Sequence, residues 1–149
     1  IQEAGVRSHT VVEMNDHSVD HYFKPWRERH ADRDIRLCHA RWQDVDRELG
    51  LFDGIFFHAF PMNEQEFVDY VLKSVTFAEH AFPSMAAHLR EGGTFTYLTT
   101  EIDSLSRRHQ RCLLRHFRSI SLHVEKLRIP DDTRDTWWAE SMVVVKAVK

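Results

Sequence analysis

The sequence predicts an α/β protein whose sheet is mostly parallel and ends in an antiparallel strand. Runs rich in β-branched and aromatic residues alternate with amphipathic stretches in the order β-α-β-α-β-α-β-α-β-β. The run at 52–58 is apolar up to its last residue, as is typical of a parallel strand buried on both faces. We therefore expect one domain over residues 1–149, with the 52–58 strand in the centre of its sheet.

The first third of the chain is expected to hold two strands and two helices. Residues 1–5 are typical of the last turn of a helix that a glycine closes. The next elements are a strand at 8–14, a helix at 17–29, a strand at 34–40 and a helix at 41–49. We expect Pro25 to interrupt the first of these helices and Gly50 to close the second.

The remaining elements follow the central strand in the same alternation. Helical periodicity extends over 65–89, with Pro83 at the start of a second segment, and Gly92-Gly93 ends it. A strand is expected at 94–99, and Asp103 is placed to cap a helix that runs to 117. Two longer strands, 120–129 and 136–148, flank a turn at 130–132 and are expected to pair antiparallel.

Composition and charge exclude several functional classes. A formal charge of -3 over 149 residues argues against the basic face of a nucleic-acid binder. No apolar run approaches the roughly 20 residues that span a bilayer, and the N-terminus lacks the order of a signal peptide. The two cysteines lie far apart and outside any CxxC motif. We expect a cytoplasmic protein that binds a small molecule and neither nucleic acid nor membrane.

Residues that close parallel strands are the first candidates for function, because ligands bind at the carboxyl ends of such strands. Glu13 closes the first strand, where a carboxylate can accept both hydroxyls of a ribose; the alternative is a solvated strand end. Trp42 and Gln43 follow the second strand. Trp42 can cover one face of an adenine ring, and the Gln43 amide can form hydrogen bonds with its edge. Trp42 can equally be a core residue.

Several segments resemble, in order and spacing, motifs of guanidinoacetate N-methyltransferase and its arginine N-methyltransferase relatives, which are class I S-adenosylmethionine-dependent enzymes. The segments are Val-Glu-Met-Asn-Asp at 12–16, Arg-Trp-Gln-Asp-Val at 41–45, Phe-Asp-Gly-Ile-Phe-Phe-His-Ala-Phe-Pro at 52–61, Gly-Gly-Thr-Phe-Thr-Tyr at 92–97 and the tail at 129–139. The resemblance covers nearly the whole chain and implies a Rossmann-like methyltransferase sheet.

The resemblance also implies site residues for S-adenosylmethionine and for the acceptor. Glu13 would bind the cofactor ribose, with Met14 and Asn15 beside it, and the adenine would lie between Trp42 and Gln43. Thr100 and Glu101 fall where the family contacts its acceptor substrate.

A first strand and a Gly-rich turn, which in this family bind the methionine part of the cofactor, have no counterpart in these residues. In the family this strand lies between the strands that contain Val11 and Ile55, so both would keep an unpaired edge. Each unpaired buried amide or carbonyl costs about 1 to 3 kcal/mol. We therefore expect the protein to need a further N-terminal segment, from the same or another chain, to complete its sheet.

His58 departs from the family pattern, which usually has an Asp at that position to hold the guanidino group of the acceptor. A carboxylate–guanidinium bond contributes about 1.5 to 3 kcal/mol, and a protonated histidine would repel the cation. Guanidinoacetate is therefore disfavoured as the substrate. A neutral imidazole between Phe57 and Phe60 can instead act as a general base; the alternative is a structural residue at a strand end.

Other clusters carry weaker hypotheses. His17 and His21 lie one helical turn apart, but two ligands among eleven histidines do not make a metal site, and we expect none. The basic segment that contains Arg107, Arg108 and His109 is expected to be a solvated helix face.

Three functions follow from these observations. The first is methyl transfer to nitrogen or oxygen of a small molecule other than guanidinoacetate. The second is a non-catalytic methyltransferase-like binding or assembly protein. The third is a guanidino N-methyltransferase of arginine or a related compound.

Overall fold

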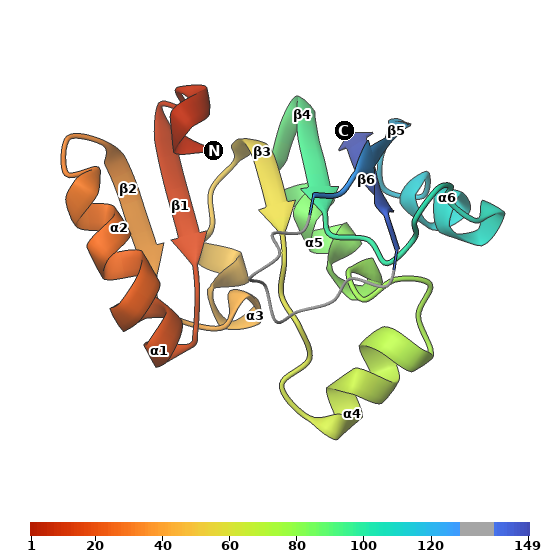
Figure 1. Cartoon of the computed structure of the whole chain (residues 1–149), viewed down its shortest axis with the longest axis horizontal. Coiled ribbons are helices and arrows are strands. Elements are labelled where there is room, and N and C mark those ends of the chain that lie inside the picture. The colour runs from red at the N-terminus through yellow and green to blue at the C-terminus, as the bar shows by residue number, and fades with distance from the viewer. Residues whose placement is uncertain (129–138) are drawn as a thin grey trace. The chain divides into compact units, whose positions relative to one another are not determined.

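The computed structural model describes residues 1–128 and 139–149, and the chain divides into two compact units, residues 1–49 and 50–149 (Figure 1). Each unit contains its own sheet, of two strands in the first and four in the second. Strands and helices alternate along both, which confirms the α/β class. The expectation of a single domain stays a prediction.

Two parallel strands and a helical segment form the first unit. β1 (Ser8–Val12) and β2 (Asp34–Cys38) pair with Val12 opposite Cys38. The connecting segment consists of α1 (Asp16–Ser18), a π-helical stretch (Val19–Phe23) and α2 (Lys24–Arg29). Pro25 lies in the first turn of α2, so the helix continues through it. Because α2 follows the π-helical stretch without a break, the missing amide proton of Pro25 removes one hydrogen bond from this segment without ending it.

The helix after β2 is shorter than expected. α3 (Trp42–Val45) is followed by one 3-10 turn (Asp46–Glu48), and the backbone becomes extended at Leu49. Among the described residues only Gly5 and Gly92 have positive φ angles, so Gly50 does not close this helix in the left-handed conformation. Gly5 has the left-handed conformation and closes the first 3-10 turn, Gln2–Ala4, as expected.

Four strands form the sheet of the second unit, in the order β3-β4-β6-β5 (Figure 1). Their bounds are Phe52–Phe57 for β3, Leu89–Tyr97 for β4, Ser119–Lys126 for β5 and Ser141–Val148 for β6. β4 runs parallel to β3, and β6 runs antiparallel to both β4 and β5. The antiparallel pairing of the last two strands is therefore confirmed. The expected turn at 130–132 and the start of the 136–148 strand lie outside the described residues.

β3 does not have the central, doubly buried position that its apolar sequence predicted. It pairs only with β4 among the described strands, and Phe57 is its one buried residue. Phe56 is 55% exposed. Burial of a strand on both faces requires that both faces of its sheet be covered, and a strand at the margin of a sheet is covered less fully than a central one. Among residues 1–128 and 139–149, β3 pairs with β4 alone.

The helices of the second unit also differ from the expected bounds. They are α4 (Glu64–Phe67) with a π-helical continuation (Val68–Leu72), a 3-10 turn (Glu79–Ala81) with α5 (Phe82–Ala87), and α6 (Arg107–Leu113). Residues 73–78 are not helical, whereas Pro83 does lie at the start of α5 as expected. β4 begins at Leu89, so Gly92 and Gly93 lie inside a strand instead of ahead of it.

Ser106, and not Asp103, caps α6. The Ser106 hydroxyl accepts the N–H of His109 at 3.2 Å, whereas the Asp103 carboxylate bonds to the Ser104 hydroxyl. The helix ends at Leu113, four residues before the predicted end.

An aromatic cluster forms the core of the second unit. Phe82 from α5 contacts Phe95 and Tyr97 of β4 edge-on or tilted, and Phe117 stacks on Phe95 with ring centroids 5.3 Å apart. Alternate residues of β6 are fully buried, as one covered sheet face requires: Val143, Val145 and Ala147. This core holds the end of β4, where the predicted acceptor residues begin.

Replacing Gly93 with alanine is expected to destabilise the protein by about 1–3 kcal/mol, the usual cost of overpacking. The added Cβ would lie 2.8 Å from the Arg90 carbonyl oxygen and 3.3 Å from that of Asp53. Urea unfolding should show a lower midpoint for Gly93→Ala. Gly50→Ala is the matched control, because its Cβ would meet no atom within 4 Å. Equal midpoints for the two variants would contradict the close packing at Gly93.

Candidate functional site

Glu13 follows β1 directly, and its side chain is half-buried. Its N–H donates to the Cys38 carbonyl at 3.1 Å, which extends the pairing of β1 with β2 by one residue. Its Oε1 accepts the N–H of Asn15 at 2.8 Å. Within the described part of the chain Oε2 has no hydrogen-bond partner. One carboxylate oxygen is therefore held while the other can accept a ligand hydroxyl.

The residues beside Glu13 start the first helix. The Asn15 side chain accepts the N–H of Ser18 at 2.9 Å and caps α1, so its carbonyl oxygen is already engaged. Asp16 lies 3.1 Å from Nε2 of His39, which follows β2. This pair links the two strand ends, and the sequence did not predict it. Met14 is half-buried beside Glu13.

Trp42 and Gln43 occupy the first turn of α3, shortly after β2 ends. β1 and β2 are parallel, so this turn lies at the same edge of the two-stranded sheet as Glu13. Trp42 is half-buried and Gln43 is exposed. The unit thus brings the residues predicted to bind ribose and adenine to the carboxyl ends of its two strands. Their roles stay predictions.

A hollow in this unit lies near the start of β1, at the end opposite Glu13. Its lining includes Gln2, His9, Trp26 and His30 and none of the predicted site residues. Burial lowers the pKa of His9. A neutral imidazole in this position suits packing against Trp26, whose ring it meets edge-on at 5.7 Å.

His58 follows β3 and is exposed, with aromatic rings around it. The Phe60 ring meets the imidazole edge-on with centroids 4.9 Å apart and stacks on buried Phe77 at 5.2 Å. Phe57 is buried and also stacks on Phe77, with ring centroids 6.4 Å apart. His58 therefore projects from an aromatic surface, with Phe60 58% exposed and available to a ligand.

Thr100 and Glu101 follow β4 and line an open hollow together with Ile102, Asp103, Ser104 and Ser106. Phe57 is opposite Tyr97 in the parallel pair, so the carboxyl ends of β3 and β4 lie side by side. Buried Thr99 donates to the Val143 carbonyl at 2.7 Å, and the Glu101 carbonyl accepts the Val143 N–H at 3.0 Å. These bonds fasten the strand end to β6 and present the Glu101 side chain to the hollow.

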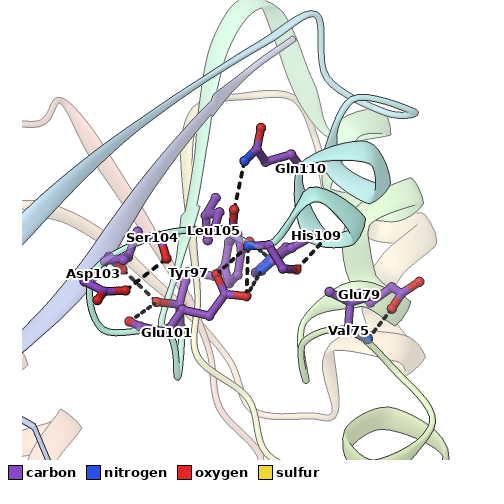
Figure 2. A network of polar contacts seen from close by, with 12 residues as sticks. Val75, Glu79, Tyr97, Glu101, Asp103, Ser104, Leu105, His109 and Gln110 are labelled. Carbon is purple, nitrogen blue, oxygen red and sulfur yellow. Dashed lines mark hydrogen bonds and ion pairs between the residues drawn. The ribbon is translucent and has the colours of Figure 1, made fainter.

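His109 contradicts the expectation of a solvated helix face. Its side chain is 1% exposed and contacts both the Tyr97 hydroxyl and the Glu101 carboxylate (Figure 2). Arg107 and Arg108, on the same helix, are exposed as expected. A signal was present in the sequence, because Leu105, Cys112 and Leu113 share the helical spacing of His109 and all four are buried.

No group of three or more potential metal ligands occurs among residues 1–128 and 139–149. The imidazoles of His17 and His21 stack with centroids 4.0 Å apart, and Nδ1 of His21 contacts the His17 carbonyl oxygen at 3.1 Å. None of the helices described is long and apolar enough to cross a membrane.

The fold is that of the class I methyltransferases. The precorrin-6y C5,15-methyltransferase of Geobacter metallireducens superposes with a TM-score of 0.64 and 13% identity over 94% of this chain and 66% of its own. Spermidine synthase from Thermotoga maritima gives a TM-score of 0.61 and 15% identity over 96% of this chain and 46% of its own. A methyltransferase homologue from Pyrococcus horikoshii gives 0.56 and 13%, over 94% and 52%. The chain thus spans between 46% and 66% of these structures, and at such identities the likeness concerns the fold alone.

Within this class, the family model of guanidinoacetate N-methyltransferase matches residues 1–126. The chain belongs to that family. No match was found among the curated proteins.

Proposed function

We propose that the protein transfers a methyl group from S-adenosylmethionine to a nitrogen or oxygen atom of a small molecule. The Glu13 carboxylate is the observation that carries this proposal. It closes a strand in a chain of a methyltransferase family, with one oxygen fixed by Asn15 and the other without a partner in the described part of the chain. That arrangement suits the hydroxyls of a ribose.

The residues of the first unit fit the nucleoside half of the cofactor. Glu13 would accept from the ribose hydroxyls, Trp42 would cover the adenine and Gln43 would bond to its edge. Met14 and Asn15 would line the same end of the sheet, with one lone pair of the Asn15 side-chain carbonyl already engaged by the Ser18 N–H. When bound, the cofactor supplies an electrophilic methyl group on a sulfonium.

The residues of the second unit would bind the acceptor. Phe60 provides exposed apolar surface beside His58, and buried Phe57 stacks on the same Phe77 that Phe60 contacts. Thr100 and Glu101 provide polar groups at the neighbouring strand end. A neutral His58 imidazole would take the proton from the acceptor O–H or N–H as that atom replaces sulfur on the methyl carbon, with S-adenosylhomocysteine as the leaving group. Alignment of the acceptor supplies most of the acceleration, and the base adds about 10²- to 10⁴-fold.

Two alternatives are kept because specific observations favour them. The family match favours a guanidino acceptor such as arginine, but His58 lacks the carboxylate that would hold the cation. The exposure of His58 favours a binding or assembly protein without catalysis. The Glu13 oxygen without a partner among the described residues suits a cofactor ribose, which favours the enzyme over the non-catalytic protein.

The proposal includes a further strand that pairs with β3 and another that pairs with β1, or one strand that pairs with both. Each of these strands has one neighbour among the described residues, and apolar Phe56 on β3 is 55% exposed. A partner strand would satisfy the open backbone edge and cover this side chain. In the full-length protein, the backbone amides of β3 that point away from β4 should then exchange slowly with deuterium, and exchange of these amides as fast as in an exposed loop would contradict the pairing.

Calorimetric titration of the full-length protein with S-adenosylhomocysteine tests the proposal directly. We expect saturable binding, and no binding up to millimolar concentration would refute the methyltransferase function. A screen with methyl-labelled S-adenosylmethionine against amines, alcohols, carboxylic acids, guanidinoacetate and arginine would then identify the acceptor. Methylation of guanidinoacetate in preference to all the others would refute the exclusion that rests on His58.

A further inference from the structure

A chain of three polar side chains leads from the core of the second unit to the open hollow at the end of β4 (Figure 2). The Tyr97 hydroxyl contacts Nε2 of His109, and Nδ1 of His109 lies 3.3 Å from Oε1 of Glu101. Tyr97 and His109 are 2% and 1% exposed, whereas the Glu101 side chain is 26% exposed. The chain therefore has two buried members and one that reaches solvent.

The proton on His109 can be placed from its neighbours. Burial, with a smaller effect of Glu101, raises the pKa of Tyr97 far above its ordinary value, so the phenol keeps its proton and can donate it to Nε2. A proton on Nδ1 then faces the Glu101 carboxylate. The opposite neutral tautomer would aim the Nδ1 lone pair at that carboxylate, which is electrostatically unfavourable.

The same contact orients Glu101. The Ser106 N–H approaches both carboxylate oxygens, at 3.4 Å to Oε1 and 3.3 Å to Oε2. Nδ1 of His109 makes no hydrogen bond that meets strict geometry with any described residue, but it lies within ion-pair range of Oε1, so a proton on Nδ1 attracts the carboxylate and favours the rotation that keeps Oε1 toward His109. Oε2 accepts the Ser106 N–H and keeps a second lone pair for a group in the hollow, which Thr100 and Ser104 also line.

We propose that His109, backed by Tyr97, is a positioning residue that holds the Glu101 carboxylate toward the methyl acceptor, which presents an N–H or O–H group to it. This inference rests on the proposed function and adds a residue to it. His109 itself does not touch the acceptor, because its ring is enclosed between Tyr97 and Glu101.

Two amide substitutions at His109 separate positioning from packing. The side-chain N–H₂ of asparagine can occupy the place of Nδ1, whereas that of glutamine reaches the place of Nε2 and faces Tyr97. In the full-length protein we expect kcat/KM for the screened acceptor to fall about 10- to 100-fold in His109→Gln, part of the 10² to 10⁴ associated with a positioned polar group. His109→Asn should stay within about threefold of the wild type, and the KM for S-adenosylmethionine should not change in either variant.

A merely structural histidine would give the opposite pattern, since both amides remove the same ring and should then lower activity and melting temperature together. Equal activity of the two variants, with S-adenosylhomocysteine binding intact, would refute the role of His109 and leave the proposed function standing. If the wild-type protein does not bind S-adenosylhomocysteine, the proposed function is refuted. ¹⁵N NMR of the wild type tests the contact without an acceptor: a protonated Nδ1 is expected, and an unprotonated Nδ1 would overturn the inference.

Discussion

In His58→Ala, kcat/KM for methyl transfer is expected to fall about 10²- to 10⁴-fold, the contribution of a positioned general base. The imidazole is exposed at the carboxyl end of β3 and lies beside the exposed ring of Phe60. Its removal takes away the proton acceptor and leaves the residues proposed for the cofactor untouched. The measurement is steady-state kinetics with the screened acceptor across roughly pH 6 to 9, together with the Kd of S-adenosylhomocysteine, which should not change.

His123→Ala is the matched control, because His123 is an exposed histidine on β5 whose only described polar partner is Glu125. It should keep wild-type activity. If His58→Ala stays within about threefold of wild type over this pH range, His58 is not the base. His58→Asp adds a second test: the carboxylate should admit cationic guanidino acceptors, and no gain of activity on guanidinoacetate would contradict the charge argument.

For Glu13→Gln we expect the Kd of S-adenosylhomocysteine to rise about 10- to 100-fold. Hydrogen bonds to a charged group contribute about 1.5 to 3 kcal/mol, and each 1.4 kcal/mol corresponds to a factor of ten. The amide keeps the size of the side chain and an oxygen for the Asn15 N–H, so the strand end should keep its conformation. Calorimetry at one ionic strength gives the ratio of the two constants.

Glu28→Gln provides the control for the lost charge, since Glu28 is an exposed carboxylate on α2 of the same unit. Its Kd should equal that of the wild type. A Glu13→Gln protein that binds S-adenosylhomocysteine as tightly as the Glu28→Gln protein would show that Glu13 is a solvated strand end.

Local patterns predicted much of the fold. The β-branched run at β1 and the alternating apolar residues at β2 predicted strands, and Gly5 and Pro83 lie at the helix boundaries expected for them. The predicted helix boundaries were wrong where more than one residue could cap the helix. Ser106 caps α6 in place of Asp103, because the chain between them is held by contacts of Glu101 that no local pattern contains.

The candidate site was predicted unevenly for the same reason. Glu13, Trp42, His58 and Glu101 were found because each follows the end of a strand or opens the next helix, and such positions are visible in the order of elements. His109 was assigned to a solvated face because its neighbours Arg107 and Arg108 are charged. Its burial depends on Tyr97, twelve residues earlier in the chain.

The sequence by itself determined the alternation of strands and helices, the antiparallel final strand and the polar residues that end β1, β3 and β4, because these depend on periodicity and on residue type. Only the tertiary structure decided that β3 is an edge strand among the described residues and that Glu101 has a buried histidine behind it. The first depends on which strands pair, and the second on the packing of α6 against Tyr97. Neither is encoded in local periodicity, because the packing and the hydrogen bonds concerned exist only once the chain has folded.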